Sequence, residues 1–209
     1  MFSLQTIFGK GDKFYGLLEA SADAARDSAA ALVKMLATRQ QQVSLDEFML
    51  ARKREKDLTA QISRELVNTF VTALDREDIE ALNSALYKIP KSIEKFAERY
   101  VIVADRLHGI DFDQRAALLE QSVSVVVEMI GELRKGLKID RVKKLRDSLH
   151  ALESEADRLL LEPYRTLYAE GSDPLRVMLA KDLFELYEKA VDKCRDVGNV
   201  VYSIVLKNS

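Results

Sequence analysis

The chain has 209 residues, of which 47% are hydrophobic and 32% charged, with eight glycines and three prolines. This composition favours long helices over sheets, and the length suffices for one large domain or two units of about 100 residues. With 32 basic and 34 acidic residues the net charge is −2. No strongly basic face is implied, so we expect no nucleic-acid partner.

The apolar runs are too short to cross a bilayer. One of them, residues 125–127, ends at Glu128. Residues 1–10 lack the charged start and the longer apolar core of a secretory signal. The single cysteine, Cys194, can form no internal disulfide, which fits a reducing compartment. We therefore expect a cytoplasmic protein that is peripheral to a membrane at most.

Apolar periodicity predicts six helices, and the first three lie in the first half of the chain. The first is expected over about residues 14–39. Ser44 opens the second, with Glu47 three residues on as a capping box. Its apolar residues recur at helical spacing: Phe48, Ala51, Leu58, Ile62, Leu66 and Phe70. Asp75 caps the third helix, and Pro90 is expected to kink it because proline removes a backbone donor.

The other three helices are bounded by aspartates and glycines. Asp111 caps the fourth helix, and residues 136–140 separate it from the fifth, which Pro163 is expected to bend. The turn at 171–174 is the clearest break in the chain. Its last two residues, an aspartate and a proline, suit the N-cap and the first position of the sixth helix.

The two halves of the chain have similar patterns of predicted helices. Each half reads as a shorter helix, a long second helix, a break near an aspartate and a long third helix. Sliding the sequence by about 100 residues places Asp57 on Asp157, an offset compatible with a duplicated unit. We therefore predict an all-α fold of six long antiparallel helices in a single domain, residues 1–209, built from two similar three-helix bundles, 14–108 and 111–207.

The sequence lacks the motifs of common catalytic sites. It contains no glycine-rich phosphate loop, no paired-cysteine zinc spacing and no Gly-x-Ser-x-Gly elbow. Neither His108 nor His150 lies in the Glu-x-x-His pattern of di-iron bundles. Cys194 falls in an apolar stripe, which indicates a buried structural thiol. These absences argue against an enzyme.

Carboxylates spaced four residues apart are the remaining candidates for chemistry. Glu153 and Asp157 lie in the expected fifth helix, and Glu188 and Asp192 lie in the sixth. Side chains at this spacing are neighbours, so two such pairs on facing helices could surround a hard cation. In a chain this rich in charge, the same spacing also arises on solvated faces that bind nothing.

Three segments resemble the PhoU-like phosphate transport regulators, in particular the subgroup associated with low-affinity Pit phosphate transporters. Residues 70–79, Phe-Val-Thr-Ala-Leu-Asp-Arg-Glu-Asp-Ile, are similar to the family's Phe-x-Thr-Pro-x-Asp-Arg-Glu-Asp-Ile segment. The others are 152–158, Leu-Glu-Ser-Glu-Ala-Asp-Arg, and 192–200, Asp-Lys-Cys-Arg-Asp-Val-Gly-Asn-Val. The resemblance runs over nearly the whole chain and implies a fold of two similar three-helix bundles.

The resemblance also implies where metal would bind. PhoU-like proteins can hold metal clusters through Glu/Asp-x-x-x-Asp motifs on the second and third helices of each half. Carried over by position, this implies a site for iron, zinc or magnesium at Glu153, Asp157, Glu188 and Asp192. The first half departs from the motif, with Lys53 in place of an acid and Tyr-Lys-Ile-Pro-Lys at 87–91. Because a protonated lysine offers no lone pair, we expect metal in the second half only.

These lysines suggest an anion site in the first half instead. The cluster would comprise four cations: Lys53, Arg54, Lys88 and Lys91. On facing surfaces of the second and third helices they could hold phosphate or an acidic surface of a partner. Alternatively, Glu55, Asp57 and Glu94 neutralise them as exposed salt bridges, each worth about 0–1 kcal/mol and without function.

These observations lead to one expected function and two alternatives. We expect a non-enzymatic accessory or regulatory protein of inorganic phosphate transport, acting by contact with a phosphate transporter or a signalling protein. The alternatives are a carboxylate metal-binding protein with a storage or hydrolytic role, and a structural helical scaffold that associates through an exposed groove. A homo-oligomer is compatible with each, since long amphipathic helices often leave an apolar strip for a symmetric partner.

Overall fold

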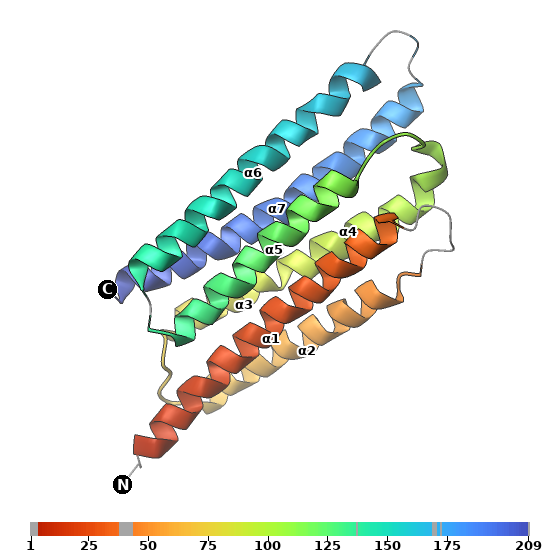
Figure 1. The fold of residues 1–209 in the computed structure, drawn as a ribbon. Helices are drawn as coiled ribbons and strands as arrows, with labels where there is room; N and C mark the ends of the chain where they lie inside the picture. The colour runs from red at the N-terminus through yellow and green to blue at the C-terminus, as the bar shows by residue number, and fades with distance from the viewer. Residues whose placement is uncertain (1–3, 38–43, 137, 169–170, 172, 209) are drawn as a thin grey trace.

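A computed structural model describes residues 4–37, 44–136, 138–168, 171 and 173–208, and these residues contain helices but no strand (Figure 1). In chain order the helices are α1 (Leu4–Ala37), α2 (Asp46–Asn68), α3 (Arg76–Leu86), α4 (Lys88–Val103), the short 3-10 helix η1 (Ala104–Arg106), α5 (Asp113–Arg134), α6 (Ile139–Leu167) and α7 (Pro174–Lys207).

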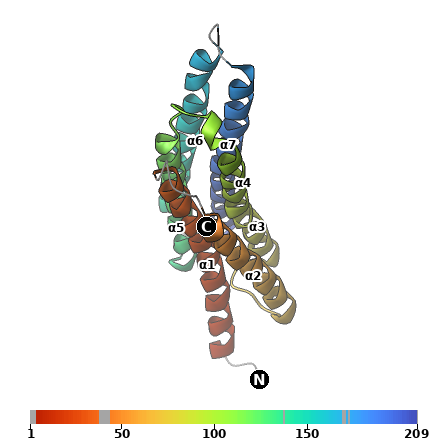
Figure 2. The same ribbon diagram turned by 90° about the vertical axis from the view of Figure 1, so that its right-hand side faces the viewer.

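The long helices lie along one direction and form an elongated bundle (Figures 1 and 2). α1 packs against α2 and α5, and α7 packs against α3, α4, α5 and α6. α3 and α4 follow each other in one row, so they take the place of a single helix. The prediction of an all-α fold with six long antiparallel helices is confirmed. Its division into the units 14–108 and 111–207 stays a prediction.

Pro90 interrupts the third expected helix, and the break falls at Tyr87. A proline ring clashes with the carbonyl four residues earlier, which here belongs to Leu86. α3 ends at Leu86, and α4 begins directly after Tyr87. The Tyr87 N–H donates to the Asn83 carbonyl at 3.1 Å, and the Tyr87 carbonyl accepts a hydrogen bond from Arg52 of α2 at 3.4 Å. The break therefore turns Tyr87 toward α2.

Polar side chains accept backbone N–H groups near the start of three helices, at the N-cap of α7 and one residue before the N-cap of α2 and α5. Asp173, Asp111 and Ser44 each accept a hydrogen bond from the backbone N–H two residues on, at 3.0, 2.8 and 3.0 Å. These bonds satisfy N–H groups that have no partner inside a helix. The capping box predicted for Ser44 is wrong, because Glu47 forms a salt bridge with Lys34 of α1 instead.

Three other predicted details differ from the structure. α1 begins at Leu4 rather than near Phe14, since the intervening glycines each weaken a helix by about 1 kcal/mol without ending it; its predicted end lies outside the described residues. α2 ends at Asn68, so Phe70 lies beyond it and is 98% exposed. At the start of α3, the carbonyl of Asp75 rather than its side chain accepts the first N–H groups.

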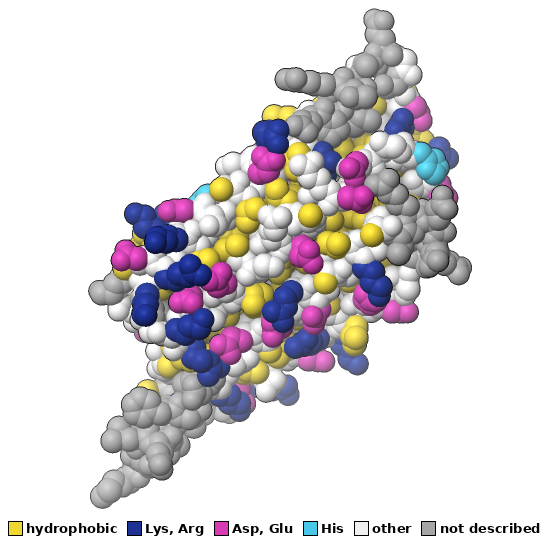
Figure 3. All heavy atoms as spheres, in the orientation of Figure 1, with side chains coloured by type: hydrophobic (Ala, Val, Ile, Leu, Met, Phe, Trp, Pro, Cys, Tyr) yellow, Lys and Arg dark blue, Asp and Glu magenta, His cyan; other side chains and the backbone are white. Residues whose placement is uncertain are grey.

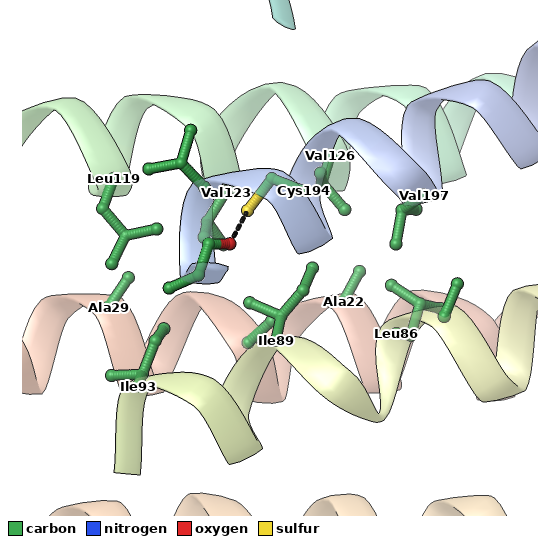
Figure 4. Close-up of a cluster of buried hydrophobic side chains, with 14 of the residues drawn as sticks. Ala22, Ala29, Leu86, Ile89, Ile93, Leu119, Val123, Val126, Cys194 and Val197 are labelled. Carbon is green, nitrogen blue, oxygen red and sulfur yellow. Dashed lines mark hydrogen bonds between the residues drawn. The ribbon is translucent and has the colours of Figure 1, made fainter. Parts of the chain in front are cut away.

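Buried apolar side chains from both halves of the chain form one continuous cluster. Figure 4 shows its centre, where Cys194 of α7 lies among side chains that include Ala22 and Ile89. The thiol is fully buried, its Sγ lies 3.5 Å from the Ala190 carbonyl oxygen, and burial raises its pKa. The predicted burial of this cysteine is confirmed.

The charged side chains are spread over the surface with both signs mixed. On the face shown in Figure 3, lysines and arginines alternate with acidic side chains, and apolar atoms lie between them. This mixture agrees with a net charge of −2. Among the helices that the structure describes, none is both long and apolar enough to cross a membrane.

α7 approaches α6 closely at Gly198. A Cβ built on this residue would lie 2.5 Å from Cδ1 of Leu149, which is itself buried. Glu153 follows Leu149 by one turn on α6, and Arg195 precedes Gly198 by about one turn on α7. The glycine therefore sets the spacing of the two helices beside these charged residues.

We expect Gly198→Ala to lower the free energy of unfolding by about 1 kcal/mol, because overpacking against Leu149 outweighs the helix propensity gained with alanine. The matched control is Gly131→Ala in α5, where an added Cβ would meet no described atom within 4 Å. This control should raise the free energy of unfolding by about 0.5–1 kcal/mol. Chemical denaturation followed by circular dichroism measures both, and equal stabilisation of the two variants would contradict the close approach.

Candidate functional site

The four carboxylates predicted to bind metal lie where α6 and α7 pack together. Glu153 and Asp157 come from α6, and Glu188 and Asp192 come from α7. The Glu153 and Asp192 side chains are 18% and 29% exposed, whereas Asp157 is exposed. The two predicted pairs are thus brought to one interface, at the edge of the core.

Arg195 of α7 lies between the two helices. Its Nη1 contacts Oε1 of Glu153, while its Nη2 lies 3.2 Å from Oδ1 of Asp192 and 3.8 Å from Oδ1 of Asp196. Burial opposes the charge on Arg195, but the three carboxylates prevail and raise the pKa of the guanidinium. A permanent positive charge is therefore held between Glu153 and Asp192.

Glu188 lies one turn before Asp192, toward the other end of the acidic row. Partial burial raises the pKa of Glu188, and the negative charges of Asp192 and Asp157 raise it further, while Lys189 acts in the opposite direction. Glu188 is thus within electrostatic reach of an acid on its own helix and of one on α6. This is the repulsion that a bound cation relieves.

As placed in the structure, the four carboxylates do not fit a metal ion. In the part of the chain that the structure describes, no three His, Cys, Asp or Glu side chains converge closely enough to hold one. The Arg195 guanidinium already lies between Glu153 and Asp192, the acids that a cation joining α6 to α7 would bridge. A metal ion could reach both acids only if Arg195 moved away.

Two of the four cations predicted to form an anion site, Arg54 and Lys91, have partners in different places. Arg54 forms a salt bridge with Asp27 of α1 at 2.7 Å, so it points to the side of α2 that faces α1. Lys91 is on α4, close to the break that follows α3. Lys53 and Lys88 are exposed. Arg54 therefore faces α1 and Lys91 lies beside Tyr87 at the α3–α4 break, and an anion site formed by all four cations stays a prediction.

Arg52, rather than Arg54, is the cation of α2 that faces α4. Its side chain is 4% exposed, its Cζ lies 4.1 Å from the centroid of the Tyr87 ring, and its Nε lies 3.4 Å from Oε2 of Glu94. A hydrogen bond from Arg52 lowers the pKa of Tyr87, whereas burial raises the pKa of Glu94 against the attraction of Arg52. Arg52 thus joins α2 to the α3–α4 break and to α4.

Glu55 is fully buried between α1 and α2. Its Oε1 accepts a hydrogen bond from the Ser21 hydroxyl at 2.7 Å, whereas its Oε2 has no hydrogen-bond partner among the described residues. Burial raises the pKa of Glu55 to about 7, against the effects of the Ser21 hydrogen bond and of the charges on Arg52 and Arg54. The alternative in which Glu55 neutralises surface cations as an exposed salt bridge is wrong.

Arg52 and Glu55 are interior residues that the sequence pattern did not predict. They follow Phe48 by four and seven residues, the spacing that also places Ile62 and Leu66 on the buried face of α2. A charged residue is normally expected to be exposed to solvent, and for this reason the burial of Arg52 and Glu55 was not predicted. The signal that could have found them is a charge in register with an apolar stripe.

The pH dependence of stability tests the burial of Glu55. Its pKa is about 7 in the folded protein and its ordinary value is 4.5, so between these values the folded state keeps a proton that the unfolded state has lost. The free energy of unfolding therefore falls as the pH rises through this window, by about 3 kcal/mol in total. We expect Glu55→Gln to remove this loss, because the amide stays uncharged. Urea denaturation over a range of pH measures it.

The variant should match the wild type at about pH 4 and exceed its stability at about pH 8. Glu80→Gln, at an exposed position of α3, is the matched control and should leave the pH profile unchanged. A Glu55→Gln profile that runs parallel to the wild type would show that Glu55 is charged in the folded protein.

Comparisons with proteins of known sequence find distant relatives. No protein-family model matches the chain. "UPF0111 protein YkaA" from Bacillus subtilis (strain 168) is 26% identical over 150 residues, which are 70% of this chain and 71% of that protein. "Putative pit accessory protein" from Rhizobium meliloti (strain 1021) is 22% identical over 201 residues, which are 94% of each chain.

Solved structures share the fold. A PhoU-like protein from Shewanella oneidensis MR-1 has a TM-score of 0.80 at 20% identity, over 92% of this chain and 96% of that one. A second PhoU-like protein from the same organism has a TM-score of 0.76 at 21% identity, over 93% and 99%. The expected resemblance to PhoU-like proteins is therefore confirmed, and the chain has the PhoU-like fold.

Proposed function

We propose that this chain, which has the PhoU-like fold, is a non-enzymatic accessory or regulatory protein of inorganic phosphate transport that acts in the cytoplasm. One observation carries the proposal: the similarity to the Rhizobium meliloti relative extends over 94% of both chains. A similarity of that extent takes in nearly the whole bundle rather than one shared motif. The fold shared with PhoU-like proteins supports the same function.

The titratable groups with the most strongly shifted pKa values are buried, which favours a function by contact with a partner over catalysis. Burial raises the pKa values of Glu55, Tyr187 and Cys194 most strongly, and these side chains are 0%, 2% and 0% exposed. Shifted groups serve catalysis when they line a cleft that a substrate can enter. Here they lie inside the packing of the helices, so a partner would meet the surface instead.

The surface that we propose for this contact is the end of α2 and the connection to α3. Val67, Phe70 and Val71 are 82%, 98% and 50% exposed, and Phe70 begins the segment 70–79 that resembles PhoU-like proteins. Neighbouring exposed apolar side chains are unfavourable in water unless a partner covers them. A phosphate transporter that buries them would gain binding energy from each.

The proposal needs no metal. The alternative of a metal-binding protein with a storage or hydrolytic role requires a cation between α6 and α7, where Arg195 already contacts Glu153 and Asp192. The alternative of a structural scaffold shares the exposed side chains of Val67 and Phe70 but requires no effect on phosphate uptake. Self-association of the chain stays a prediction.

Co-purification with a Pit-type phosphate transporter from the same cell tests the proposed contact. We expect Val67→Ser combined with Phe70→Ser to reduce the bound transporter by at least about tenfold, because each lost apolar contact weakens binding by about 1–3 kcal/mol. Ile102→Ser is the matched control. It removes an apolar side chain that is 78% exposed near the end of α4, at the opposite end of the bundle (Figure 1), and should leave binding unchanged.

Measuring phosphate uptake in cells distinguishes the proposed regulatory function from the structural scaffold. Deleting the gene should change the rate of uptake, and the wild-type chain but not the double variant should restore it. Uptake that is unaffected by the deletion would refute the proposed function. Binding that is lost in the double variant while uptake stays normal would point to the scaffold.

A further inference from the structure

The acidic row between α6 and α7 contains its own cation. Glu153 of α6 and Asp192 of α7 both contact the guanidinium of Arg195, which is 28% exposed. A guanidinium presents N–H groups in one plane, so it can donate to carboxylates on two helices at once. Arg195 thus makes the link between α6 and α7 that a shared metal ion would make.

Neighbouring residues hold Arg195 in this position. Asp192 lies three residues before it on α7, so the two side chains share one face of the helix. Gly198, about one turn further on, sets the distance from α7 to α6 and so lets the guanidinium reach Glu153. Lys193 pairs with Asp196 at 2.8 Å, which leaves Asp196 as a weaker competitor for Arg195 at 3.8 Å.

Arg195 and a divalent metal ion exclude each other at Glu153 and Asp192. Both would need the oxygens that face the α6–α7 interface, and two positive centres that close together would repel. We propose that Arg195 is the resident cation of the α6–α7 acidic row and makes the second half of the chain independent of metal. This proposal concerns the row itself and holds whether or not the chain binds a transporter.

The other acidic residues of the row determine what the removal of Arg195 would do. Glu188 lies four residues before Asp192 on α7, so the two carboxylates are neighbours on one face of the helix. Without Arg195 the row would carry four carboxylates, drawn from two helices and deprived of the cation that links them. Carboxylate oxygens are ligands that Mn²⁺ and Mg²⁺ accept, so a divalent cation could then enter between Glu153 and Asp192, the two acids that Arg195 joins.

Metal titration of the full chain tests the proposal. We expect wild-type protein to take up no stoichiometric Mn²⁺ or Zn²⁺ by calorimetry and elemental analysis. Arg195→Met, which keeps an apolar stem of similar length, should bind at least about tenfold more tightly than wild type. Adding Asp192→Asn to it should abolish that gain. Arg158→Ala, which removes an arginine that pairs with Glu155 on the outer face of α6, should behave as wild type.

Wild-type protein that binds metal as tightly as Arg195→Met would overturn the proposal, and so would an Arg195→Met variant that binds no better than Arg158→Ala. Circular dichroism verifies the fold of each variant, and Arg195→Ala replaces Arg195→Met if the latter does not fold.

The midpoint temperature of unfolding in metal-free buffer gives a second test. In the wild type, Asp192→Asn removes an ion-pair partner of Arg195 and should lower the midpoint or leave it unchanged. In the Arg195→Met background, the same change removes an uncompensated negative charge next to Glu188 and should raise the midpoint. The same sign in both backgrounds would show that Arg195 is not the counter-charge of this row.

Discussion

The burial of α7 along most of its length is the constraint on which the rest of the structure depends. Its buried residues extend from Ala180 to Val205, and the helix packs against α3, α4, α5 and α6. Helices from both halves of the chain therefore share one apolar core around it. At its C-terminal end, Lys207 pairs with Asp78 of α3 at 2.5 Å. Since packing fixes the rotation of α7, residues on its edges, such as Arg195, meet fixed partners.

The number and type of the helices could be predicted from the sequence because the apolar spacing agrees with the positions of the capping and helix-breaking residues. Asp173 as N-cap and the break caused by Pro90 act locally, within one turn, so the sequence is enough to place them. Phe70 shows the limit of periodicity. It continues the apolar spacing of α2, but the helix ends at Asn68, and a pattern of residue types cannot tell an exposed apolar side chain from a buried one.

The candidate site was less predictable, because its ion pairs join residues that belong to different helices. The four-residue spacing found the acids at Glu153 and Asp192, and the three-residue spacing to Arg195 was also visible in the sequence. That Arg195 reaches Glu153 on another helix depends on the rotation of α6 against α7, which the close approach at Gly198 sets. For the same reason the burial of Arg52 was not predicted, because its partners Tyr87 and Glu94 lie outside its own helix.

Both halves of the chain place an arginine where their second and third helices meet. In the first half Arg52 of α2 lies against Tyr87 and pairs with Glu94 of α4, and in the second half Arg195 of α7 pairs with Glu153 of α6. In each case a covalently attached cation neutralises half-buried acids, so the link between the helices does not vary with the supply of metal. An arginine also keeps its charge at every physiological pH, which makes both links constant.

A bundle fixed in this way offers a partner a constant shape. Under the proposed function, a signal about phosphate would have to enter through the partner, or through a group whose charge changes near neutral pH. Among the described residues in the interior, Glu55 is such a group, since burial raises its pKa to about 7 and one of its oxygens lacks a partner. It lies between α1 and α2, and α2 leads directly into the exposed side chains of Val67 and Phe70. The helix that carries the proposed contact surface thus also carries a buried carboxyl group whose pKa is about 7.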